Sequence, residues 1–154
     1  MYPMIEASSL AALRTHLQSI PQVRAMQVEI VGETAGRLRL DAPLAPNIND
    51  KGSAFGGSLA SLMTLAGWAL ATSRLADAGL KAEVYVADST VRYLAPLEAD
   101  LRAEAWLEEG GWETFVATFR QRGRSRCRIA ACVRLPDGGE ATVFSGRFVA
   151  LRPD

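Results

Sequence analysis

The sequence predicts an α+β domain in which a twisted antiparallel sheet wraps around one long central helix. Two observations lead to this prediction. No charged residue occurs between Lys51 and Arg74, as in a helix that is apolar on all sides. After Lys81 the chain has the pattern of successive strands separated by turn residues. A helix without a polar face needs a covering layer, and a curled sheet can supply it.

The composition is that of one domain, residues 1–154, in which residues 1–25 form an N-terminal helical extension. Of the 154 residues 49% are hydrophobic, and 17 basic residues balance 17 acidic ones. A formal net charge of zero gives no reason to expect nucleic acid or an anionic membrane as a partner. The uncharged segment holds too many Gly, Ser and Thr residues for a membrane span. No signal peptide is apparent, so we expect a cytoplasmic protein.

The sequence offers no residues for a metal site, and we expect no cofactor. The two cysteines, Cys127 and Cys132, are five residues apart in one expected strand. Their side chains therefore point to opposite faces and cannot form a disulfide with each other. The single histidine, His16, stands near the N-terminus, where we expect it to be a solvated surface residue.

The N-terminal half predicts a helix, a hairpin and the long helix. Residues 7–19 have the leucine spacing of an amphipathic helix. Two alternating segments, 26–31 and 37–40, flank a glycine-containing turn and predict a hairpin. The long helix is expected over 54–76.

The C-terminal half predicts only strands, joined by short antiparallel connections. They are expected at 83–94, 101–107, 115–119, 127–135 and 143–151. In the third of these, Phe115, Ala117 and Phe119 would face inward.

The strand at 83–94 is unusual because a carboxylate interrupts one of its faces. Strict alternation places Val84, Val86 and Asp88 on one face, and Tyr85 and Tyr93 on the other. Asp88 is therefore expected either at a dimer seam or at a functional site.

This plan resembles the hot-dog fold of acyl-CoA thioesterases over roughly residues 26–152. Many small thioesterases of that superfamily carry an Asn-x-x-Gly-x-x-His-Gly-Gly motif at the start of the central helix. Here Asn49, Gly52, Gly56 and Gly57 have the same spacing. The resemblance implies hydrolysis of acyl thioesters at the N-terminus of the long helix.

Further segments are similar to one bacterial branch of these enzymes. Residues 86–96 look like the strand that follows the central helix. The order Asn-x-Asn-x-Lys-Gly-x-Ala-Phe-Gly-Gly-Ser from Asn47, followed by Gly67 and Trp68, resembles a thioesterase domain also found fused behind a GNAT-type acetyltransferase. This chain contains no acetyltransferase module.

Two positions depart from the family pattern. Phe55 stands where many members have His, and Thr64 stands where many have the Asp or Glu general base. The resemblance to the family therefore predicts the fold and the ligand class of this chain better than its catalytic mechanism.

Hydrolysis of a thioester needs a clamp on the carbonyl oxygen and an activated water. The backbone N–H of Gly57, at the positive end of the long helix, suits the clamp. Gly56 and Gly57 let a carbonyl approach without a Cβ in the way, or they serve only tight helix packing. Ser58 either donates to the same oxygen or caps the helix.

Four residues are candidates for water activation: Asn49, Asp50, Thr64 and Asp88. Each has a structural alternative. Asn49 suits an Asx turn, Asp50 a solvated turn, and Thr64 a packed helix face. Asp88 would act from a partner subunit.

Substrate contacts are expected from residues around the motif and from basic side chains. Besides Gly56 and Ser58, the candidates are Phe55, Arg92, Tyr93 and Arg120. Arg120 begins a ladder of arginines at even positions up to Arg128, across a turn at Gly123. One or two of them could hold the phosphates of coenzyme A, although a solvated strand face is the alternative.

Two functions follow from this resemblance. The first is a thioesterase that hydrolyses acyl-CoA or acyl-carrier-protein thioesters at a dimer-interface site. The second is a non-catalytic acyl-CoA-binding module. A hot-dog dehydratase is excluded because it needs a His/carboxylate pair, which His16 alone cannot build. We expect a homodimer or a dimer of dimers, because the strand at 83–94 would otherwise leave an open edge.

Overall fold

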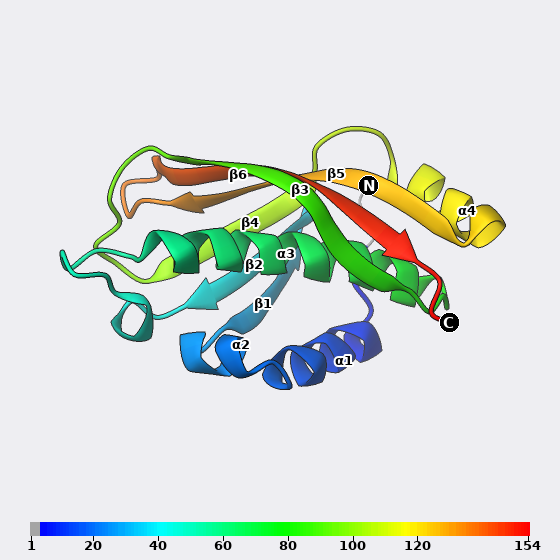
Figure 1. The fold of residues 1–154 in the computed structure, drawn as a ribbon, viewed down its shortest axis with the longest axis horizontal. Helices are drawn as coiled ribbons and strands as arrows, with labels where there is room; N and C mark the ends of the chain where they lie inside the picture. Colours follow the sequence, from blue (N-terminus) through cyan, green and yellow to red (C-terminus); the bar gives the residue numbers. More distant parts are fainter. Residues whose placement is uncertain (1–3) are drawn as a thin grey trace.

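The computed structural model describes residues 4–154 and has the expected α+β hot-dog architecture (Figure 1). A six-stranded antiparallel sheet, in the order β1-β2-β4-β5-β6-β3, curls around the long helix α3. The elements are α1 (Ala7–Gln18), α2 (Pro21–Met26), β1 (Glu29–Thr34), β2 (Arg37–Ala42), α3 (Gly56–Asp77), β3 (Glu83–Tyr93), β4 (Leu101–Leu107), α4 (Trp112–Arg122), β5 (Arg124–Arg134) and β6 (Glu140–Leu151). A 3-10 turn at Ala45–Asn47 precedes α3.

The helix α3 forms the core, as its lack of charge predicted. Leu62, Met63 and Leu70 are fully buried against the sheet. A Cβ at Gly67 would lie 2.6 Å from the ring of Phe148, so glycine permits the close approach of helix and sheet there. In the described part of the chain, no helix has the length and hydropathy of a membrane span.

The N-terminal region agrees with the prediction except at one boundary. The helix expected at 7–19 is α1, and the expected hairpin is β1 and β2. The segment 26–31, expected as one strand, instead begins with the last residue of α2. Pro21 starts this short helix, and Gln27 ends it with a left-handed φ of 58°. The first three residues of the expected N-terminal extension lie outside the described part.

The strand expected at 115–119 is wrong, because these residues belong to helix α4. Phe115 and Phe119 are both buried. Residues four apart share a face in a helix and also in a strand, so the apolar spacing fitted both. The intervening Ala117 is exposed, as a helix requires. Gly123 then ends α4 with a φ of 72°.

The strand β3 lies at the edge of the sheet, hydrogen-bonded to β6 alone. Its predicted faces are partly wrong, because a bulge at Ala87 shifts the alternation. Val86 lies opposite Phe148, whose ring contacts α3, and so faces inward. Asp88 lies opposite Arg147 and faces away from α3. The two residues therefore do not share a face.

Candidate functional site

The N-terminus of α3 presents three open backbone N–H groups. Phe55 is the N-cap, with an extended backbone and no capping side chain. The first intrahelical donor is the N–H of Leu59, which binds the carbonyl of Phe55 over 3.1 Å. The N–H groups of Gly56, Gly57 and Ser58 precede it and have no intrahelical acceptor. They lie at the positive end of a 22-residue helix, which favours an anion or a developing oxyanion.

The loop before α3 is held by the side chain of Asn49. Its Oδ1 accepts hydrogen bonds from the N–H of Lys51 at 2.7 Å and of Ser53 at 3.0 Å. Its Nδ2 donates to Oγ of Ser53 at 2.9 Å. The backbone N–H of Phe55 in turn donates to the carbonyl of Asn47 over 2.7 Å. The amide of Asn49 therefore shapes the loop that presents the open N–H groups.

Two exposed aromatic rings flank the open N–H groups. The hydroxyl of Tyr93, at the end of β3, donates to the carbonyl of Gly56 over 2.9 Å. Phe55 is 55% exposed and Tyr93 56% exposed. A Cβ at Gly57 would lie 2.5 Å from the ring of Phe55. The structure thus brings together Phe55, Gly56, Gly57 and Tyr93. Ser58 is buried beside them and does not cap the helix.

The carboxylates expected at the site lie elsewhere in the chain. Asp50 is exposed in the loop and accepts a hydrogen bond from Nζ of Lys51 over 2.9 Å. Asp88 accepts one from Arg147 over 2.7 Å on the outer face of the sheet. It lies five residues before Tyr93 in β3, about 16 Å along the strand. Within the described chain, each of these two carboxylates is hydrogen-bonded to a basic side chain and not to the open N–H groups.

Thr64 and the two arginines are also separated from the N-terminus of α3. The hydroxyl of Thr64 donates to the carbonyl of Ala60 in its own helix, over 2.8 Å. Arg92 lies opposite Val143 on the outer face. Arg120 belongs to α4 and donates to the carbonyl of Ala78 over 3.3 Å. Ala78 follows the last residue of α3. Because α3 is about 33 Å long, Arg120 lies near the C-terminal end of this helix, far from its N-terminus.

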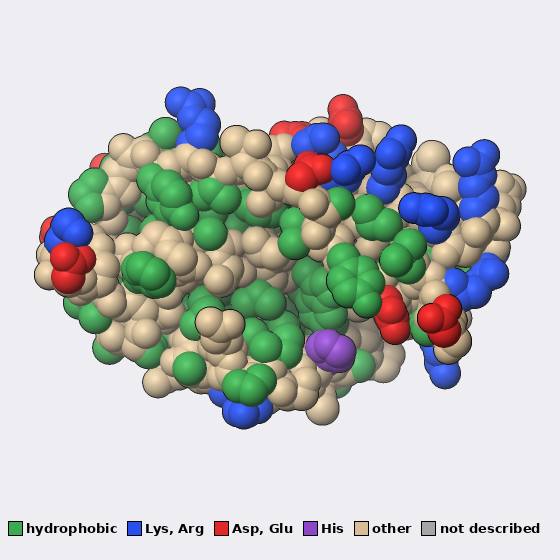
Figure 2. Space-filling view, in the orientation of Figure 1, with side chains coloured by type: hydrophobic (Ala, Val, Ile, Leu, Met, Phe, Trp, Pro, Cys, Tyr) green, Lys and Arg blue, Asp and Glu red, His purple; other side chains and the backbone are tan. Residues whose placement is uncertain are grey.

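Apolar side chains gather along the open edge next to this site. Figure 2 shows a hydrophobic band across the face formed by β3 and α3. The exposed large apolar residues of β3 and of the segments next to it and to α3 include Phe55, Tyr85, Val86, Tyr93 and Leu94. Exposed apolar residues along an edge strand are typical of a surface that another chain covers.

The structure also forms two cavities. No signal in the sequence indicated the first, whereas the second includes members of the arginine ladder. The ring of His16 is exposed, as expected, but stacks on Trp68 with centroids 5.1 Å apart. Together with Tyr85 they line a cavity of about 430 Å³. A second cavity lies beside α4, where arginines of α4, β5 and β6 meet. Both depend on contacts between elements far apart in the chain.

Comparisons with known proteins place the chain among thioesterases. The model of the family described as "Putative thioesterase (yiiD_Cterm)" matches residues 10–152. A solved protein of unknown function from Chlorobaculum tepidum is similar with a TM-score of 0.89 and 25% identity, covering 97% of this chain and 98% of that one. A "putative thioesterase" from Shewanella oneidensis has a TM-score of 0.84 and 29% identity, covering 96% and 100%. A thioesterase from Haemophilus influenzae, at 16% identity and a TM-score of 0.73, covering 97% and 94%, shares the fold.

Proposed function

Because the chain belongs to the yiiD_Cterm thioesterase family, we propose that it hydrolyses acyl thioesters of coenzyme A or of an acyl carrier protein. The observation that carries this proposal is the uncapped N-terminus of α3. Its open N–H groups stand in a loop whose spacing of Asn49 and Gly57 matches the thioesterase motif. The rings of Phe55 and Tyr93 beside them provide an apolar border for the thioester.

In the proposed reaction the carbonyl oxygen of the thioester accepts a hydrogen bond from the N–H of Gly57. This bond polarises the carbonyl carbon, and water attacks it. The N–H and the helix dipole stabilise the oxyanion of the tetrahedral intermediate. The carbon–sulfur bond then breaks, the thiolate takes up a proton, and the products are a carboxylic acid and a thiol. Gly56 and Ser58 complete the backbone cradle of the oxyanion.

Water activation in this proposal relies on polar groups rather than on a histidine. Thr64 stands seven residues after Gly57 in the sequence, at the position of the usual base. In its own chain it lies about 10 Å along α3 from Gly57, so in the proposed dimer it would serve the site of the other copy. It can orient a water while it donates to Ala60, because its oxygen retains lone pairs. Asp50 and Asp88 are the remaining carboxylate candidates. A site without a strong base should turn over slowly, since general-base catalysis contributes about 10²–10⁴-fold.

The proposed active unit is a homodimer, alone or as half of a dimer of dimers. The edge strand β3 is 11 residues long and carries exposed apolar side chains on its open side. A two-fold axis near the middle of β3 would join the two sheets edge to edge in antiparallel fashion. The N-terminus of α3 in one copy would then face the start of β3 in the other.

A non-catalytic acyl-CoA-binding module is the second candidate, and one observation favours it. Within residues 4–154, no side-chain carboxylate or imidazole forms a hydrogen bond with the residues of the open N–H groups. The amide of Asn49 is already engaged in its loop. Such a site would hold a thioester without activating water.

A panel of acyl-CoA esters and acyl carrier proteins separates the two candidates. Thiol release and calorimetric binding are measured side by side over short, medium and long acyl groups. We expect release above the uncatalysed rate for at least one ester. Tight binding with no release for any panel member would replace the thioesterase proposal by the binding module.

A further inference from the structure

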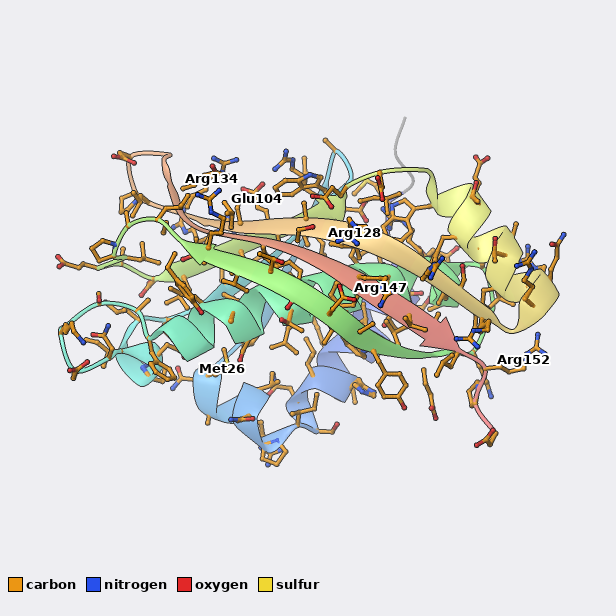
Figure 3. The ribbon with its side chains drawn as sticks, turned by 45° about the horizontal axis from the view of Figure 1, so that its top comes forward. Met26, Glu104, Arg128, Arg134, Arg147 and Arg152 are labelled. Carbon is orange, nitrogen blue, oxygen red and sulfur yellow. The ribbon has the colours of Figure 1, made fainter. Side chains whose placement is uncertain are left out.

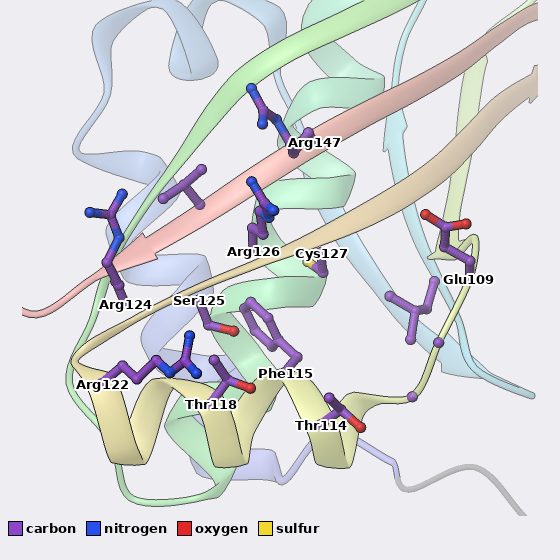
Figure 4. Close-up of a pocket in the computed structure, with 14 residues that line it drawn as sticks. Glu109, Thr114, Phe115, Thr118, Arg122, Arg124, Ser125, Arg126, Cys127 and Arg147 are labelled. Carbon is purple, nitrogen blue, oxygen red and sulfur yellow. The ribbon is translucent and has the colours of Figure 1, made fainter.

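A cavity of about 700 Å³ lies between α4 and the first half of β5 (Figure 4). Four arginines line it: Arg122 from α4, Arg124 and Arg126 from β5, and Arg147 from β6. Glu109 is the only carboxylate in its described lining. The cavity is thus strongly basic in a chain whose formal net charge is zero.

The strand β5 has an open edge in this cavity. β4 pairs with β5 only from Ile129 to Val133, so residues 124–127 have β6 on one side and no strand on the other (Figure 1). These four residues line the cavity. The carbonyl of Arg128 accepts a hydrogen bond from Glu108 over 2.9 Å and therefore points to the β4 side. Because backbone direction alternates along a strand, the N–H and carbonyl of Arg126 point to the same side. Within residues 4–154, these backbone groups of Arg126 have no partner strand and face the cavity.

Three of the four arginines that line the cavity differ from the other arginines of the sheet. Outside the cavity, Arg128 pairs with Glu108 and Arg134 pairs with Glu104 (Figure 3 labels both arginines). Within the cavity lining, Arg147 pairs with Asp88. In contrast, Arg122, Arg124 and Arg126 make no ion pair with any residue of the described chain. Like charges held together repel each other, and a bound anion would remove this repulsion.

The other walls of the cavity suit a ligand that is only partly charged. Phe115, Leu107 and Val149 provide apolar surface, and the hydroxyls of Thr118 and Ser125 provide further donors. The volume falls in the range of about 300–1,000 Å³ typical of small-molecule sites. Guanidinium groups bind phosphate oxygens with two parallel hydrogen bonds.

We propose that this cavity binds a phosphate-bearing ligand of nucleotide size. Its phosphates lie between Arg122, Arg124 and Arg126, and the remainder of the ligand lies on the apolar wall beside Phe115. Such a ligand is either a free nucleotide or the nucleotide half of coenzyme A. In one chain the cavity is remote from Gly57, because α4 packs near the far end of α3. Binding of a free nucleotide would therefore be independent of thioester hydrolysis, whereas binding of coenzyme A rests on the proposed function.

Calorimetric titration of the full chain tests this proposal with three probes: adenosine 3′,5′-bisphosphate, ATP and inorganic pyrophosphate. We expect saturable binding of a nucleotide, weakened when the ionic strength rises from about 0.05 M to about 0.5 M. Stronger binding of the bisphosphate identifies coenzyme A as the source, and stronger binding of ATP identifies a free nucleotide.

Substitutions locate the bound ligand. The double variant Arg124→Ala/Arg126→Ala should bind the preferred nucleotide at least about tenfold more weakly, because each loses charge-assisted hydrogen bonds. The matched control is Arg102→Ala, an exposed arginine of β4 outside this cavity, which should bind normally. Arg126→Gln provides a milder change should the double variant fold poorly by circular dichroism. Gly57→Val should bind the preferred nucleotide with unchanged affinity, even if this variant no longer hydrolyses thioesters.

Three results would overturn the proposal. One is the absence of saturable nucleotide binding up to about millimolar concentration, the weakest range of specific affinity. Another is unchanged affinity in both the double variant and Arg126→Gln. The last is binding of an acidic peptide by the same arginines without binding of any nucleotide.

Discussion

The hydroxyl of Tyr93 donates a hydrogen bond to the carbonyl of Gly56 over 2.9 Å, which joins the end of the edge strand to the first residue of the central helix. A Cβ at Gly56 would lie 3.3 Å from the Tyr93 ring, so the contact is close. This bond places an exposed aromatic ring beside the open N–H groups of α3. The edge of the sheet and the proposed oxyanion clamp therefore form one surface.

Gly57→Val should abolish turnover while the fold is kept. The new side chain would meet the Phe55 ring, with its Cβ 2.5 Å away, and would occupy the space of the thioester carbonyl. The measurement is kcat with the preferred acyl-CoA, with circular dichroism as a check on folding. The control Ala76→Val, exposed near the other end of α3, should retain kcat. An unchanged kcat in folded Gly57→Val would remove this residue from the site.

Single substitutions should show how water is activated. We expect Thr64→Val to lower kcat by about tenfold or more, as loss of a water-orienting group does. Asn49→Ala should lower kcat by loosening the loop that Asn49 holds. Asp50→Ala and Asp88→Asn should change kcat little, because each carboxylate forms an ion pair with a basic side chain away from Gly57. Loss of nearly all turnover in either carboxylate variant would identify that residue as the base.

Val86→Lys should convert the proposed dimer into monomers. Val86 is 40% exposed on β3, and a charge there opposes edge-to-edge pairing of two sheets. The measurement is sedimentation velocity at micromolar concentration. Val31→Lys is a matched control, since Val31 is 47% exposed on β1 at the opposite edge of the sheet. A monomeric wild-type protein would contradict the proposed assembly directly.

Glu33→Ala should strongly destabilise the fold. Glu33 and Arg74 form a buried ion pair with contacts of 2.9 Å and 2.6 Å, and both side chains are less than 5% exposed. Removal of one partner leaves a buried charge, which costs about 3–5 kcal/mol. The control Glu104→Ala breaks partly exposed pairs with Arg37 and Arg134 and should cost less than about 1 kcal/mol for each pair. Urea unfolding measures both changes, and equal costs would contradict the expected role of burial.

The thiol of Cys127 should react slowly with iodoacetamide in the native protein. Burial raises its pKa to about 12, so almost no thiolate exists near pH 8. Burial also raises the pKa of Cys132, which is fully buried. Labelling should remain slow up to about pH 10 in buffer and become fast in urea, where a free thiol has a pKa of about 8.5. Fast native labelling at pH 8 would contradict this burial.

The central helix and the edge strand were predictable because their signals are local. The absence of charge from Gly52 to Ser73 identifies a buried helix without any knowledge of its neighbours. The strand β3 was predicted to within one residue at its C-terminal end. The wrong assignment of 115–119 arose because burial of residues four apart does not distinguish a helix from a strand.

The sequence by itself determined the architecture, the thioesterase motif and the position of Gly57 at the start of α3, because periodicity and motif spacing are properties of neighbouring residues. Only the tertiary structure decided where each charge points. The bulge at Ala87 turned Asp88 to the outer face and paired it with Arg147. Long-range strand pairing left Arg124 and Arg126 beside an open edge, where neither forms an ion pair with another residue of 4–154. Register between strands is set by contacts far apart in the chain, and a local pattern does not contain them.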